Sequence, residues 1–103
     1  MSEQHAVLIQ LGTSHSPDDL AELEDKLAAL VEHEGVGEFD GHEIGPDKTT
    51  LFLYGPDADV LFSVVQATLH QNMISNNARV ILRYGDAGST QREFVLSGRS
   101  TVS

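Results

Sequence analysis

The sequence contains no cysteine and no tryptophan, and only 6% of its 103 residues are aromatic. Without cysteine the chain can form neither a disulfide framework nor a thiolate metal site, and it has no cysteine nucleophile. This agrees with a reducing compartment. The sequence also lacks a basic segment followed by an apolar one, and no run approaches the roughly 20 apolar residues that a membrane-spanning helix needs. We therefore expect a cytoplasmic protein that does not associate with a membrane.

Basic residues are scarce as well, since six Lys and Arg stand against 16 Asp and Glu and give a net charge of −10. The imbalance lies in residues 1–47, where twelve acidic residues face one lysine, for a net charge of −11. Residues 48–103 carry five basic and four acidic residues, a net charge of +1. Such an acidic chain repels phosphate backbones, which argues against nucleic-acid binding. The acidic half can attract a cationic protein, or it can be a solvated surface that maintains solubility.

The length of the chain limits it to a single domain, residues 1–103, with one hydrophobic core. Short apolar segments alternate with longer segments of helical period, and Gly, Pro and Asn separate them. Strands are expected at five places: 6–11, 37–45, 49–54, 79–84 and 92–96. The last residues, 97–103, are expected to form a loose tail.

Two helices are predicted between these strands. Ser16 can cap the first helix, Pro17 suits its first position, and Gly35 and Gly37 can end it. Its apolar residues recur three and four positions apart, as on the buried side of a helix: Leu20, Leu23, Leu27, Leu30 and Val31. The second helix begins near Asp57 or Asp59, with a predicted buried stripe of Val60, Leu61, Val64, Val65, Thr68 and Leu69.

The order of elements, β-α-β-β-α-β with one more strand, predicts an α+β domain with the ferredoxin-like plait. In that fold two right-handed crossovers put both helices on one face of an antiparallel sheet. The other face, here called the open face, has no covering layer. Alternation along the strands assigns to it Leu8, Phe52, Tyr54, Arg79, Ile81 and Arg83. This set is too apolar to face water comfortably, so we expect a lid, a ligand or, as the simplest solution, a second copy in a homodimer.

Two short segments contain residue types that catalysis or metal binding uses. His15 lies between two serines at the junction of the first strand and the first helix, but the sequence places no third group beside it. A loop histidine near a helix cap explains it as well. Asp40, His42 and Glu43 could bind a metal, with Asp40 and His42 on one face of a strand, yet a catalytic zinc needs three protein ligands. A polar edge strand protected from aggregation by its charges explains the same residues.

The remaining candidates are weaker. The turn between Tyr54 and Asp59 could hold an anion on free helix amides, but its two Asp side chains fill that role and repel phosphate. His5, His33 and His70 are expected to be isolated surface residues. We therefore predict no catalytic residue, no metal site and no cofactor.

Two motifs carry a resemblance to other proteins. The stretch from Gly37 reads GEFDGHEI, and the stretch from Leu51 reads LFLYGPDADVLF. With this combination, most clearly over residues 37–84, the chain resembles small uncharacterised bacterial proteins in which an EFDGHE hairpin precedes a YGPDAD helix start. The resemblance implies a ferredoxin-like fold without an assigned activity, and it transfers no catalytic residue.

These observations favour a non-enzymatic protein-interaction or regulatory domain, with an immunity-type protein as one version, that dimerises through the open face. A cationic partner protein would dock on an acidic surface made of Asp18, Glu22, Asp25, Glu38, Asp40 and Glu43. The alternative is a small enzyme or ligand sensor with a pocket at the open face or in a dimer cleft. That pocket would use His15, His42 or Tyr54 with Arg79 or Arg83.

Overall fold

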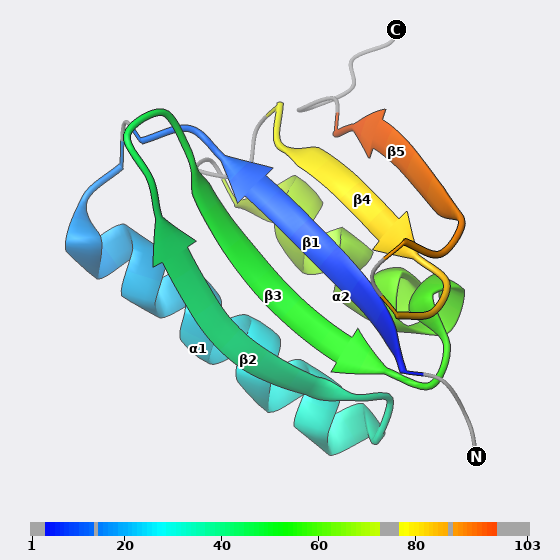
Figure 1. Cartoon of the computed structure of the whole chain (residues 1–103). Helices are drawn as coiled ribbons and strands as arrows, with labels where there is room; N and C mark the ends of the chain where they lie inside the picture. Colours follow the sequence, from blue (N-terminus) through cyan, green and yellow to red (C-terminus); the bar gives the residue numbers. More distant parts are fainter. Residues whose placement is uncertain (1–3, 14, 73–76, 87, 97–103) are drawn as a thin grey trace, which may run out of the picture.

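A computed structural model describes residues 4–13, 15–72, 77–86 and 88–96 of the chain. The predicted tail, 97–103, lies outside the described residues. Five strands and two helices follow one another along the chain (Figure 1). They are β1 (His5–Leu11), α1 (Pro17–Glu34), β2 (Glu38–Ile44), β3 (Thr49–Gly55), α2 (Ala58–Gln71), β4 (Arg79–Arg83) and β5 (Gln91–Val95).

The strands form one antiparallel sheet in the order β2-β3-β1-β4-β5. Both helices cover the same face of this sheet, and the other face carries no helix in the described part of the chain (Figure 1). The arrangement is the predicted ferredoxin-like plait, with β5 added beside β4 as the extra edge strand. Neither helix among the described residues is long and apolar enough to cross a membrane.

Helix α1 begins and ends at the residues that the sequence indicates. The Ser16 hydroxyl accepts a hydrogen bond from the backbone N–H of Asp19 at 3.0 Å, and Pro17 occupies the first turn. Gly35 ends the helix in the left-handed conformation, with φ of 68°, which costs a residue without Cβ little. The buried side of the helix consists of Leu20, Leu23, Leu27 and Val31.

Asp57 caps the start of helix α2, and its side chain accepts from the backbone N–H groups of Asp59 and Val60. Its buried side differs from the prediction. Val60 is 45% exposed, whereas Phe62 is buried against the core and meets Phe94 of β5 edge to face. The apolar run Val60-Leu61-Phe62 is compatible with several orientations of the helix. Packing against the fifth strand selects the orientation that buries the largest side chain.

His5 is not the isolated surface residue that the sequence suggests. Its Nδ1 accepts a hydrogen bond from the backbone N–H of Ala58 at 3.0 Å, so His5 caps the start of α2 from β1. Its ring meets the ring of Tyr84 edge to face, with centroids 5.7 Å apart. The Tyr84 hydroxyl in turn donates to Oδ1 of Asp59 at 2.7 Å. Side chains from β1 and from the chain after β4 therefore hold the start of α2 in place.

The surroundings of Tyr84 lead to a prediction about its ionisation. Burial raises the pKa of the Tyr84 hydroxyl above the ordinary 10.0, its hydrogen bond to Asp59 raises this pKa further, and Arg92 acts in the opposite direction. Because the folded state favours the neutral phenol, this group stabilises the fold below its unfolded pKa of about 10, and the contribution is lost as the pH rises through the folded pKa.

We expect Asp59→Asn to lower the pKa of Tyr84, since it removes the carboxylate that the phenolate would repel. The measurement is an alkaline titration of tyrosine absorbance in a Tyr54→Phe background, in which Tyr84 is the only tyrosine. An unchanged pKa in the Asp59 variant would show that this pair does not form in solution. Asp47→Asn, at an exposed acid in the turn between β2 and β3, is the control.

Candidate functional site

The open face of the sheet is confirmed as the side that the helices leave uncovered. The core face of the three central strands consists of Val7, Ile9, Leu51, Leu53, Val80 and Leu82, all of which are buried. The residues between them in sequence point the other way and are half-buried or exposed, among them Leu8, Phe52, Tyr54, Arg79, Ile81 and Arg83. The sequence therefore identified both faces correctly, because alternation in the central strands is regular.

Strand pairing arranges the open face into three rows that cross the sheet from β2 to β5. Each row joins residues that lie opposite one another in neighbouring strands. The first row is Glu38, Tyr54, Ala6, Arg83 and Gln91; the second is Gly41, Phe52, Leu8, Ile81 and Glu93; the third is Glu43, Thr50, Gln10, Arg79 and Val95. The β2 end of this face is thus acidic, its middle is largely apolar, and β4 is basic.

The charged groups of these rows have few partners in the same copy. Arg79 pairs with Glu93 at 3.2 Å, and the Nε of Arg83 donates to the carbonyl of Gly85 at 2.8 Å. No ion pair involves Glu38 or Glu43 among the residues that the structure describes. Both carboxylates are exposed and can meet a charge on another molecule.

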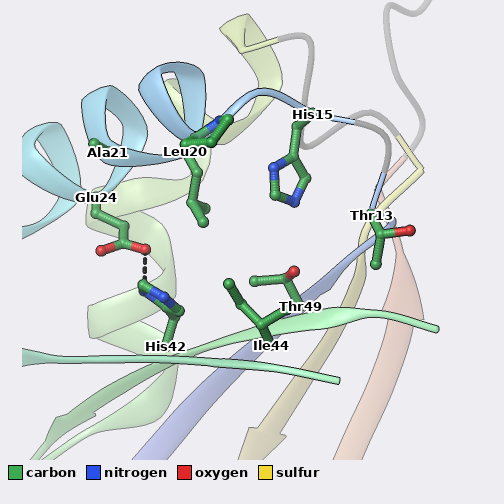
Figure 2. Close-up of a pocket in the computed structure, with 9 residues that line it drawn as sticks. Thr13, His15, Leu20, Ala21, Glu24, His42, Ile44 and Thr49 are labelled. Carbon is green, nitrogen blue, oxygen red and sulfur yellow. Dashed lines mark ion pairs between the residues drawn. The ribbon is translucent and has the colours of Figure 1, made fainter. Parts of the chain in front are cut away.

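A pocket of about 360 Å³ lies on the opposite side of the sheet, between the first half of α1 and the end of the β2–β3 hairpin (Figure 2). Its apolar walls come from Pro17, Leu20 and Ala21 on α1 and from Ile44 on β2. Five side chains with polar groups also line it: Thr13, His15, Glu24, His42 and Thr49. The structure therefore brings His15 and His42 to one cavity, and it places Tyr54, Arg79 and Arg83 on the other face of the sheet.

Several polar atoms in this pocket lack hydrogen bonds. Both ring nitrogens of His15 and the hydroxyl of Thr49 are buried and have no hydrogen-bond partner among the described residues. Oε2 of Glu24 lies 2.5 Å from Nδ1 of His42, an ion-pair distance (Figure 2). The two groups are not aligned as a hydrogen bond, so this oxygen too is buried without a hydrogen-bond partner in the described part of the chain.

The Asp40–Glu43 segment is irregular where the prediction assumed regular alternation. The pairing of β2 with β3 shifts between Phe39 and Gly41, so Asp40 is the extra residue of a bulge. His42 pairs with the core-facing Leu51 and reaches the pocket, but Asp40 does not share its face through regular alternation. Among the described residues, no three His, Asp or Glu side chains are placed to hold one metal ion.

Two lining residues, Glu24 and Thr49, were not among the candidates from the sequence, although each carried a signal. Glu24 stands four residues after Leu20, at the border of the apolar stripe of α1, and only 17% of its side chain is exposed. Thr49 alternates with Leu51 and Leu53 and is completely buried. A polar residue at a position that periodicity assigns to the core is the pattern to search for.

The six residues of the predicted acidic surface are all exposed, but they come from two layers. Asp18, Glu22 and Asp25 belong to α1, where Glu22 pairs with Lys26 at 3.9 Å. Glu38 and Glu43 share rows with Tyr54 and Thr50 and so belong to the open face. Asp40 is the bulge residue between them.

The unpartnered hydroxyl of Thr49 predicts a stabilising substitution. A buried hydroxyl without a hydrogen bond costs about 1–3 kcal/mol, and valine replaces it with a methyl group of similar size. We expect Thr49→Val to raise the free energy of unfolding by about 1 kcal/mol, measured by urea denaturation. Thr50→Val, at the half-exposed neighbour on the other face, is the matched control. A loss of stability at position 49 would show that the hydroxyl has a partner in solution.

Comparison of the chain with protein-family models, with curated proteins and with solved structures gives no match.

Proposed function

We propose that the protein is an interaction domain that forms a homodimer by stacking the open faces of two sheets. The observation that carries this proposal is the self-complementarity of the open face, which is acidic along β2, apolar in the middle and basic along β4. An apolar surface bordered by opposite charges on its two sides matches a second copy of itself.

The row structure supports one orientation of the two copies. A twofold axis parallel to the strands, lying between the two sheets, places β2 of one copy over β4 of the other and keeps each row at its own height. Glu38 then meets Arg83 of the second copy, and Glu43 meets Arg79 of the second copy. Phe52 of each copy then packs on Leu8 of the other copy. An axis perpendicular to the strands would instead place β2 on β2 and bring like charges together.

The size of the face sets the expected strength of the dimer. In this orientation four strands of each copy overlap, β2, β3, β1 and β4. With strands about 4.8 Å apart and rows about 7 Å apart along them, the contact measures roughly 20 Å by 20 Å. This is about 400 Å² per copy, below the roughly 600–1,000 Å² per partner of stable interfaces and in the range of weak, transient ones. The dimer should therefore dissociate on dilution, and micromolar affinity is the expected order of magnitude.

The first test is the mass in solution, by light scattering after size exclusion, over a hundredfold range of protein concentration. A dimer that dissociates on dilution is expected, and Phe52→Glu should give a monomer at every concentration. Val60→Glu, which places the same charge on an exposed apolar side chain of α2, should leave the dimer intact. Circular dichroism checks that both variants fold. A wild-type monomer at the highest concentration would overturn the proposal.

A further inference from the structure

The pocket between α1 and the β2–β3 hairpin has the size and composition of a small-molecule site. Its volume of about 360 Å³ lies within the range of ligand pockets in proteins, and its walls are mainly apolar with a few polar groups. Both lining residues that belong to β2, His42 and Ile44, are open to solvent, so a ligand can enter along β2. The site lies on the helix-covered side of the sheet and does not depend on the proposed dimer.

The buried polar atoms are the second observation that points to a ligand. Thr49 is completely buried and lines the pocket with an unpartnered hydroxyl. Both ring nitrogens of His15 are also buried and have no hydrogen-bond partner among the described residues. Nearly all buried polar side-chain atoms in folded proteins have a hydrogen-bond partner. A molecule in the pocket that carries a hydroxyl or a similar group would supply the missing partner to Thr49 and His15.

The charge of the pocket indicates what else the ligand carries. Among the described residues, Glu24 is the only acidic one that lines the site, and no lysine or arginine lines it. An anion would meet this carboxylate without a permanent cation to compensate, so phosphates and carboxylic acids are unfavourable ligands. A carboxylate has about four acceptor positions, so Glu24 can bind an ammonium group while its contact with His42 persists. The net charge of −10 also attracts cations to the molecule.

These groups lie at two ends of one cavity. Leu20 projects between the Glu24–His42 pair on one side and His15 on the other, with Thr49 and Ile44 below (Figure 2). We propose that the pocket binds a small organic amine that has an apolar body and a second polar group. The ammonium would pair with Glu24, the body would pack on Leu20 and Ile44, and the polar group would bond to His15 and Thr49.

Tyramine is a suitable probe, because it joins an ammonium group to a phenol through an apolar body. Two analogues change only the charged end: tyrosol carries a hydroxyl there, and 3-(4-hydroxyphenyl)propanoate carries a carboxylate. Titrations followed by amide chemical shifts should show tyramine binding with a dissociation constant of about 0.1–1 mM, as expected for a ligand of this size. The shifts should centre on residues 15, 24, 42 and 49. Tyrosol should bind at least about tenfold more weakly, and the carboxylate should not bind.

Two variants assign the binding to the proposed groups. Glu24→Gln should raise the dissociation constant for tyramine about tenfold and remove the preference for tyramine over tyrosol. Glu22→Gln, at an exposed position of the same helix, should change neither.

Four results would overturn the proposal. The first would be binding of the carboxylate analogue as tight as that of tyramine. The second would be an unchanged affinity of Glu24→Gln for tyramine. The third would be the absence of any amide chemical-shift change at the pocket residues at about 10 mM tyramine, roughly ten times the weakest expected dissociation constant. Saturable binding of Zn²⁺ alone at His15 and His42, without binding of tyramine, would be the fourth.

Discussion

Gly55→Ala is expected to destabilise the protein by about 3 kcal/mol or more, a large part of the stability of a domain of this size. A Cβ atom at position 55 would lie only 2.3 Å from the backbone oxygen of Val36, far inside the contact distance of two such atoms. The same close approach appears from the other side, where a Cβ on Gly37 would lie 2.2 Å from the backbone oxygen of Tyr54. The obstructing atoms are backbone, so no side-chain rotation can relieve the clash.

Urea denaturation of Gly55→Ala and Gly12→Ala measures this effect. A Cβ atom at Gly12 would meet nothing within 4 Å in the described part of the chain beyond its sequence neighbours, and the backbone there is not left-handed. Its replacement should therefore change the free energy of unfolding by less than about 1 kcal/mol. Equal stability of the two variants would mean that the start of β2 and the end of β3 do not approach each other this closely in solution.

The role of Gly55 also explains part of the motif on which the resemblance depends. In the sequence Tyr54-Gly55-Pro56-Asp57, the glycine allows β3 to pass close to Val36, and the aspartate caps α2. Ala58 is buried and donates its N–H to His5. These residues have structural reasons to be present. The motif therefore predicts a fold rather than an activity, and the resemblance itself stays a prediction.

The sequence predicted the fold well, because the signals that determine it are local. Ser16, Pro17 and Gly35 specify the limits of α1, and regular alternation in β1, β3 and β4 assigns each side chain to a face. The buried side of α2 was harder to predict. Its first turn offers adjacent apolar residues, and the choice between Val60 and Phe62 depends on contact with Phe94 of β5, a distant part of the chain.

The pocket could be predicted only in part, for a related reason. His15 and His42 were candidates because histidine often serves in catalysis or metal binding. Their position at one pocket depends on the crossover that places α1 beside β2. The bulge at Asp40 adds a further step. Regular alternation would place Phe39 and His42 on opposite faces of the sheet, whereas with the bulge both lie opposite core-facing residues of β3. Glu24 becomes significant only when His42 lies opposite it. Contacts between elements, rather than spacing within them, define this site.

Reversing one charge at each end of the open face should separate the two possible orientations of the dimer. In the proposed orientation, Glu43→Arg alone would place an arginine opposite Arg79 of the other copy, and Arg79→Glu alone would place a carboxylate opposite Glu43 of the other copy. Each repulsion would occur at two symmetric places in the homodimer. We expect either change to weaken self-association by about tenfold to a hundredfold, since exposed ion pairs contribute modestly but each is lost twice and replaced by repulsion.

An equimolar mixture of the two single variants is the decisive sample. In the proposed orientation, a heterodimer of Glu43→Arg with Arg79→Glu restores opposite charges at both symmetric places, so the mixture should dimerise about as well as the wild type. The mass in solution and its dependence on salt measure this directly. Glu93→Gln controls for the pair that Arg79 makes within its own copy at 3.2 Å, and it should not weaken the dimer.

The other orientation gives the opposite pattern. If β2 lay on β2, the first row of one copy would face the third row of the other, so Glu43 would oppose Glu38 and Arg79 would oppose Arg83. Each single variant would then replace a repulsion by an attraction and strengthen the dimer, and mixing the two would gain nothing over the better component. The twofold axis parallel to the strands would be wrong in that case, even if the open face remained the interface.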